Sequence, residues 1–188
     1  MARLTRVAMT LAVLSGAVAP AVAQDTSQGR SAYLRAVADF FQVSPDEIAI
    51  LADWDLPAQE IPVALFVAER AGVSPDAVVA LRRSGSSWAE VARRYHIDAA
   101  HFHVPLPGDV DAGVLSRAYD RYRSLPPREW RTVMLGDGEI ITLVNLRLIS
   151  QTLQVPADEV LVLAPSDESW VQVYAGLLRD PALPHPLP

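Results

Sequence analysis

The chain has 188 residues, of which 51% are hydrophobic and 20% are charged, and it contains neither lysine nor cysteine. This composition fits one globular domain or two small ones, and the lack of cysteine excludes disulfides, thiol catalysis and cysteine-based zinc sites. The formal net charge of −6 disfavours a general nucleic-acid binder, which needs a basic face to neutralise phosphates.

The first 23 residues have the pattern of a secretory signal peptide. A basic start with Arg3 and Arg6 precedes an apolar run over 7–18, and Ala-Val-Ala at 21–23 supplies the small residues of a cleavage site. The run is shorter than a membrane span, which needs about 20 strongly apolar residues. We therefore expect cleavage after residue 23 and a mature protein that is periplasmic or secreted and not transmembrane. Losing two of 16 arginines leaves 14 against 22 acidic residues, a net charge of −8.

The mature chain is predicted to be helical throughout. Apolar residues recur three and four positions apart, which is the spacing of one face of a helix. The best strand candidate, 139–148, also fits a helix because its apolar residues share one helical face. The expected helices are 31–42, 44–54, 58–71, 75–84, 87–96, 112–124, 138–153, 156–164 and 167–179.

Three segments of the chain align with one another without gaps, namely 37–51, 67–81 and 149–163. Each has a valine and, three residues later, an aspartate at matching positions. The matching residues are Val43, Val73 and Val155, and Asp46, Asp76 and Asp158. Self-similarity of this kind is typical of helical repeats. We predict an all-α fold in which capped helix-turn-helix repeats pack as a small helical array or bundle.

Helix ends within these units carry recognisable capping residues. Ser44 is expected to cap a helix with its hydroxyl, and Glu47, three residues later, to complete a capping box. Ser87 and Glu90 form a second such pair. Gly85 is expected to end the preceding helix in the left-handed conformation.

Three stretches resemble a family of exported bacterial proteins. They are Val-Ser-Pro-Asp-Glu-Ile at 43–48, Ser-Gly-x-Ser-Trp-x-Glu-Val-Ala at 84–92, and Leu-Val-Asn-Leu-Arg-Leu-Ile-Ser at 143–150. These stretches are similar to uncharacterised exported helical-repeat proteins of high-GC bacteria, over about residues 33–98 and 130–178. The resemblance carries no known activity and implies only a helical fold and export.

The expected organisation after the signal peptide (1–23) has four parts. Residues 24–103 form a helical domain with two repeats, and the turn-rich stretch 104–111 is a linker. Residues 112–180 form a helical segment with the third repeat. The tail, 181–188, has four prolines and is expected to be disordered.

A histidine cluster is the candidate metal site. His96, Asp98, His101 and His103 lie within eight residues, and imidazole and carboxylate groups are ligands for zinc or copper. Helical geometry points His96 and His101 in different directions, so only a loop would bring all four together. A metal-binding envelope protein is therefore one alternative function, and histidines exposed without a metal are the simpler interpretation.

A second alternative is a DNA-binding regulator. Residues 87–98 resemble the first helix and turn of a helix-turn-helix motif, which requires a basic and polar recognition helix afterwards. Residues 99–105 contain no arginine and end in proline. With the acidic balance, this leads us to expect no nucleic-acid partner.

One basic and aromatic stretch is the candidate partner-binding surface. With Asp120 and Glu129 included, its net charge is +3, from five arginines and two acids. Such groups suit an envelope protein, peptidoglycan or an anionic lipid, whereas the alternative is a solvated helix whose rings rest on the core. The residues are Arg117, Tyr119, Arg121, Tyr122, Arg123, Arg128, Trp130 and Arg131.

The sequence contains no nucleophile motif, phosphate-binding loop or His-Glu-x-x-His pattern. We therefore expect no enzyme and no cofactor. The preferred hypothesis is a non-catalytic exported helical module that binds or scaffolds other components of the cell envelope.

Overall fold

The computed structural model describes residues 19–108, 110–164 and 169–180, and these residues form an all-α structure without strands. Residues 1–18 of the predicted signal peptide and the tail 181–188 lie outside the described residues. The α-helices are α1 (Ala19–Phe41), α2 (Pro45–Asp53), α3 (Ile61–Ala71), α4 (Pro75–Arg83), α5 (Trp88–Arg94), α6 (Ala99–Phe102), α7 (Ser116–Ser124), α8 (Asp137–Leu153), α9 (Ala157–Val162) and α10 (Trp170–Arg179). Three 3-10 helices accompany them, η1 (Ala58–Glu60), η2 (Gly113–Leu115) and η3 (Pro127–Thr132).

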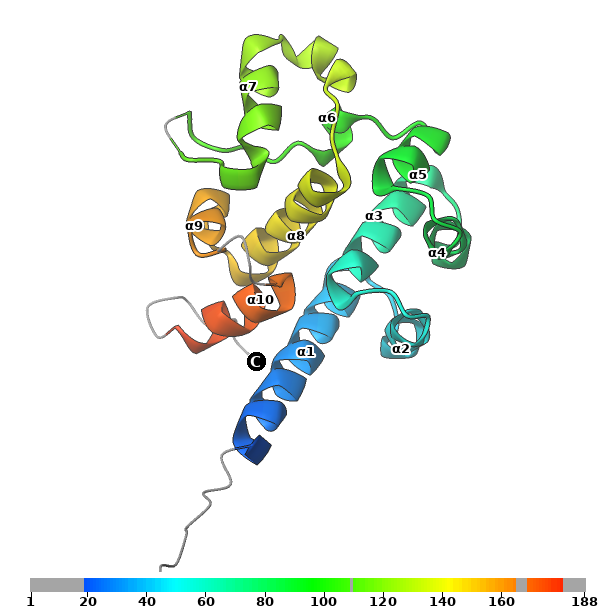
Figure 1. The fold of residues 1–188 in the computed structure, drawn as a ribbon, viewed down its shortest axis with the longest axis vertical. Helices are drawn as coiled ribbons and strands as arrows, with labels where there is room; N and C mark the ends of the chain where they lie inside the picture. Colours follow the sequence, from blue (N-terminus) through cyan, green and yellow to red (C-terminus); the bar gives the residue numbers. More distant parts are fainter. Residues whose placement is uncertain (1–18, 109, 165–168, 181–188) are drawn as a thin grey trace, which may run out of the picture.

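Helices α3 and α8 pack together at the centre of the array, and α1 packs against both of them and along α10 (Figure 1). Helices α2, α4 and α9 lie at the periphery, and α7 forms one end with η3. One buried apolar cluster extends from Tyr33 in α1 to Leu177 in α10. The predicted small helical array is confirmed, and the segments on either side of residues 104–111 share a single core.

Several helix boundaries differ from the expected ones. Helix α1 begins at Ala19, so it runs across the predicted cleavage site at residue 23. The expected helix 58–71 begins as the 3-10 turn η1. Helices α6 and η3 were not expected, and η3 forms after a proline-rich stop because Pro127 sits in its first turn, where a missing N–H costs nothing. No helix among the described residues is long and apolar enough to cross a membrane.

Five helices end in the same way. A residue in the left-handed conformation follows the helix, and the next N–H donates to the carbonyl five residues earlier at 2.9–3.2 Å. The left-handed residues are Gln42, Gly72, Gly85, His96 and Gln154. Three of these five caps close the first helix of the three aligned segments, which therefore share a local geometry. The internal repeat itself stays a prediction.

The predicted N-terminal caps are present with one exception. The Ser44 hydroxyl accepts the Glu47 N–H at 3.1 Å. The reciprocal bond, from the Ser44 N–H to the Glu47 carboxylate, is absent, so the capping box is incomplete. Ser87 and Glu90 make both bonds of theirs. Gly85 has φ = 97°, which confirms the expected left-handed end.

A buried amide connects four elements of the core. Tyr33 in α1 donates its hydroxyl hydrogen to Oδ1 of Asn145 in α8. Nδ2 of Asn145 donates to the carbonyls of Gln59 and Ile141 at 2.9 and 2.8 Å. The Gln59 side chain accepts the N–H of Trp170 in α10 at 3.1 Å. Asn145 is completely buried, so these bonds satisfy an amide that would otherwise be costly to bury.

A second buried polar group anchors α4 and α5 to the centre. Glu60 accepts hydrogen bonds from Arg82 Nε and from the Trp88 indole, both at 2.8 Å. Arg82 also donates to Asp137 at 2.9 Å. The hydrogen bond that Arg82 donates to Glu60 is the main cause of the raised pKa of Arg82.

Candidate binding surfaces around helix α6

The structure does not bring the four residues of the candidate metal site together. Asp98 caps α6 by accepting the Ala100 N–H at 3.0 Å, and the same oxygen lies 2.9 Å from His101 Nδ1. His96 is exposed at the left-handed end of α5. His103 lies beyond α6 among aromatic rings. Among the described residues, no three or more His, Cys, Asp or Glu side chains are placed to hold a metal ion.

His103, from the candidate metal site, instead packs against the aromatic residues of the candidate partner-binding surface. Its ring centroid lies 4.1 Å from that of Trp130, 4.8 Å from Tyr122 and 5.7 Å from Tyr119. The Tyr122 hydroxyl donates to the Ala99 carbonyl at 2.8 Å, and the Tyr119 hydroxyl donates to that of Val104. These contacts fix the turn after α6 against α7 and η3.

The aromatic members of the predicted partner surface therefore face the core. Tyr119 and Tyr122 are each 2% exposed, and Trp130 is half-buried with its indole N–H shared between the carbonyls of Tyr122 and Leu125. Burial raises the pKa of Tyr119 to about 12 and also raises the pKa of Tyr122. Only the arginines of this stretch are available to a partner.

Arg147 in α8 lies beneath the aromatic cluster and was not recognised as a candidate from the sequence. Its Nη2 donates to the carbonyls of His101 and His103 at 3.1 and 2.8 Å, and its guanidinium carbon lies 5.0 Å from the Phe66 ring centroid. Its Nη1 is buried without a hydrogen-bond partner among the described residues. Burial lowers the pKa of Arg147, and burial followed by the Arg147 charge lowers the pKa of His103.

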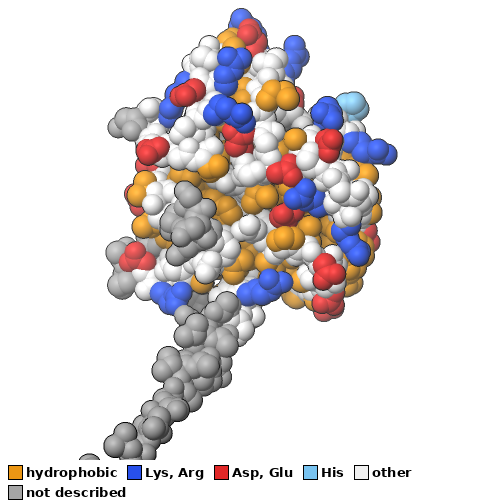
Figure 2. Space-filling model, viewed as in Figure 1, with side chains coloured by type: hydrophobic (Ala, Val, Ile, Leu, Met, Phe, Trp, Pro, Cys, Tyr) orange, Lys and Arg blue, Asp and Glu red, His pale blue; other side chains and the backbone are white. Residues whose placement is uncertain are grey.

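The five arginines of the predicted surface remain exposed on α7 and η3. Arg117 lies 3.4 Å from Glu139, and Arg123 donates to the Pro107 carbonyl at 3.2 Å. Arg128 lies 3.6 Å from Glu129. Figure 2 shows arginine side chains, with a few acidic ones, on the end of the molecule that α7 and η3 form in Figure 1. We refer to Arg117, Arg121, Arg123, Arg128 and Arg131 as the arginine face.

A groove of about 530 Å³ lies between α5, α6 and the segment 131–135 that leads from η3 into α8. Its floor is apolar and includes Ile97, Phe102 and Ile140. Three of the sequence-predicted site residues line it, namely His96, Asp98 and Arg131. Ligand pockets commonly have volumes of roughly 300–1,000 Å³ and mostly apolar walls, so this groove has the size and lining of a binding site.

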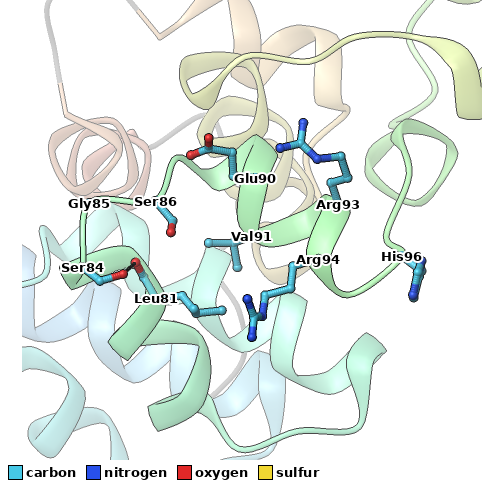
Figure 3. Close-up of a pocket in the computed structure, with 9 residues that line it drawn as sticks. All are labelled: Leu81, Ser84, Gly85, Ser86, Glu90, Val91, Arg93, Arg94 and His96. Atoms are coloured by element: carbon cyan, nitrogen blue, oxygen red, sulfur yellow. Dashed lines mark hydrogen bonds between the residues drawn. The ribbon is translucent and has the colours of Figure 1, made fainter.

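A second hollow, of about 660 Å³, lies where the turn after α4 meets α5 (Figure 3). Arg94 extends from α5 toward α4, whereas Glu90 and Arg93 extend from another side of α5, and His96 lies apart from them. Glu90 is already bound to the backbone N–H of Ser87, which is the main cause of its lowered pKa. Because the charged groups do not converge, we assign no ligand to this hollow.

The region that resembles a helix-turn-helix motif differs from a DNA-binding domain in its second helix, α6. Helix α6 has four residues, and its Phe102 is buried. A recognition helix presents several side chains along a groove of DNA, which a single turn of helix cannot do. Comparison with known protein families, curated proteins and solved structures finds no significant match.

Proposed function

We propose that this protein is a non-catalytic helical module, exported to the periplasm or secreted, that binds an anionic component of the cell envelope through the arginine face. The observation that carries the proposal is the arrangement of α7 and η3. Their aromatic rings pack on His103 and leave five arginines exposed above a rigid base. The signal-peptide pattern of residues 1–23 supports the compartment.

The form of the arginine face favours an anionic partner. Guanidinium groups make paired hydrogen bonds to carboxylate and phosphate, and the packed rings beneath them hold the backbone of α7 and η3 in place before a partner binds. Apart from these five arginines, the chain has 11 arginines against 22 acidic residues. The arginine face is thus a local positive region on an acidic protein, which favours one orientation toward a negatively charged surface.

Co-sedimentation tests the proposal. The mature chain is mixed with peptidoglycan sacculi, and separately with vesicles of phosphatidylethanolamine and phosphatidylglycerol, at low salt. We expect Arg121→Gln combined with Arg123→Gln to weaken binding about 30-fold, since each arginine near an anionic surface contributes roughly 1 kcal/mol and a tenfold change in affinity corresponds to about 1.4 kcal/mol. The control is Arg30→Gln with Arg83→Gln, which removes two exposed arginines from α1 and α4.

Comparing sacculi with vesicles shows whether the partner is peptidoglycan or an anionic lipid. Equal losses in the test and control variants would indicate a general charge effect and contradict a defined face. Absence of binding to either ligand, and to envelope proteins in a pull-down with the same variants, would contradict the proposed function.

A further inference from the structure

The groove between α5, α6 and residues 131–135 has one wall that is unusual for a helical protein. Val133 is extended, with φ = −68° and ψ = 132°, and the chain stays non-helical until α8 begins. Among the described residues, the N–H groups of Met134 and Leu135 have no hydrogen-bond partner, nor do the carbonyls of residues 133–135. An extended segment with unpaired backbone groups is a template for pairing with another strand.

Apolar surface accompanies these backbone groups. Val133 is buried, Leu135 is half-buried, and Met134 is 80% exposed although it lines the groove. Ala89 and Ala92 of α5 also line the groove. Small alanine side chains leave room for a chain to lie between α5 and the extended segment.

Two arginines and one aspartate line the groove, so its charged side chains are positive on balance. Arg93 and Arg131 line it and are exposed. Asp98 also lines it, and one oxygen of its carboxylate, Oδ1, is bound to the Ala100 N–H and to His101. The groove therefore offers guanidinium groups to a carboxylate beside an apolar floor.

From these observations we propose that the groove binds an extended apolar peptide that carries a carboxylate, either an acidic side chain or a free C-terminus. The peptide pairs its backbone with residues 133–135, places apolar side chains on the floor beside Phe102, and directs its carboxylate to Arg93 and Arg131. This peptide site does not depend on binding by the arginine face, although Arg131 borders both.

Panning a random octapeptide library with free C-termini on the mature chain tests the inference. We expect enrichment of apolar peptides with an acidic residue or a required C-terminal carboxylate. Fluorescence polarisation then measures the affinity of an enriched, fluorescein-labelled peptide. Met134→Asp should weaken binding about tenfold or more, because it places a like charge at the groove. The control is Val162→Asp on α9, a residue 73% exposed, which should change the affinity less than about twofold.

A scan of single N-methylated amides in the same peptide tests the backbone pairing. Strand pairing uses every second N–H on each edge, so sensitivity should alternate along the peptide. No enrichment, uniform insensitivity to N-methylation, or full affinity for the Met134→Asp variant would overturn the inference. Binding of dodecanoate by the groove in the absence of peptide enrichment would also overturn it.

These experiments distinguish failure of envelope binding by the arginine face from failure of peptide binding by the groove. Met134→Asp should leave sedimentation with sacculi or vesicles unchanged, whereas Arg121→Gln with Arg123→Gln should leave peptide affinity unchanged. Circular dichroism of each variant verifies that the helical fold is kept.

Discussion

At the scale of single residues, His103 shows how packing gives a side chain a role that spacing alone does not predict. Sequence spacing grouped it with His96, Asp98 and His101 as a metal ligand. The turn after α6 instead directs its ring between Trp130 and the two buried tyrosines. Helical and loop spacing determines how far apart residues are along the chain, but the packing of distant helices decides which ones meet.

The position of His103 predicts a pH dependence of stability. Its pKa is lowered by burial and by Arg147, so between the ordinary value of about 6.5 and the lowered value the unfolded chain binds a proton that the folded chain does not. Stability should therefore fall as the pH is lowered through this window and level off below it. Because the ring is only half-buried, we expect a loss below about 1 kcal/mol.

Urea unfolding at pH 7 and at pH 5 measures this effect. His103→Phe keeps an aromatic ring in the cluster and removes the proton, so this part of the pH dependence should disappear. His96→Gln is the control, because glutamine already occupies the same left-handed geometry at Gln42 and Gln154. An unchanged difference between the two pH values in His103→Phe would contradict the assignment to His103.

Arg147 is a residue that the sequence did not identify as part of a site. It lies within the predicted helix 138–153 among apolar residues. An exposed arginine at the edge of a helix has the same local sequence, so the sequence does not show that Arg147 is half-buried. Only the structure shows that its guanidinium reaches two carbonyls of the turn after α6. Its partners are backbone atoms more than 40 residues away, and backbone atoms leave no signature in the sequence.

At the scale of elements, the helices themselves were largely predictable because capping chemistry is local. Ser44, Ser87 and Gly85 act at the ends that were expected of them. The left-handed glutamines at 42 and 154 were not identified as caps, because glutamine has no strong preference for that conformation. The short helices α6 and η3 were missed since neither is long enough to show a periodic pattern.

The left-handed end of α8 gives a prediction at this scale. Gln154 has φ = 56°, a conformation that is costly for a residue with a Cβ and free of that cost for glycine. Gln154→Gly should therefore stabilise the protein by about 0.5–1 kcal/mol, measured as the free energy of unfolding in urea. Gln151→Gly, in the last turn of the same helix, should lower stability by about 1 kcal/mol instead. A destabilised Gln154→Gly variant would contradict the importance of this cap.

At the scale of the whole molecule, the aligned segments end up in one core rather than in separate bodies. Asn145 connects α8 to α1, and Glu60 and Arg82 connect η1, α4 and α8 through Asp137. The pairing of these polar residues across the chain was not predictable, because each looked like an ordinary surface residue within its own segment. Their burial requires the partners that the structure supplies.

The same scale explains why the two surfaces lie where they do. Helices α6, α7 and η3 form an end of the array that has no counterpart in the first two aligned segments. Packing of their aromatic rings fixes the arginine face, and the extended exit from η3 into α8 forms the wall of the groove. The arginine face thus belongs to this end of the array, and so does part of the groove, to which α5 and α8 also contribute lining residues.

Native mass spectrometry of the untagged protein from separated cell fractions tests the central claim most directly. Export predicts a chain that begins at Gln24 in the periplasmic or secreted fraction, and a bound envelope component would add its own mass to that chain. A full-length chain, still carrying residues 1–23 and found in the cytoplasm, would contradict the account of an exported envelope module.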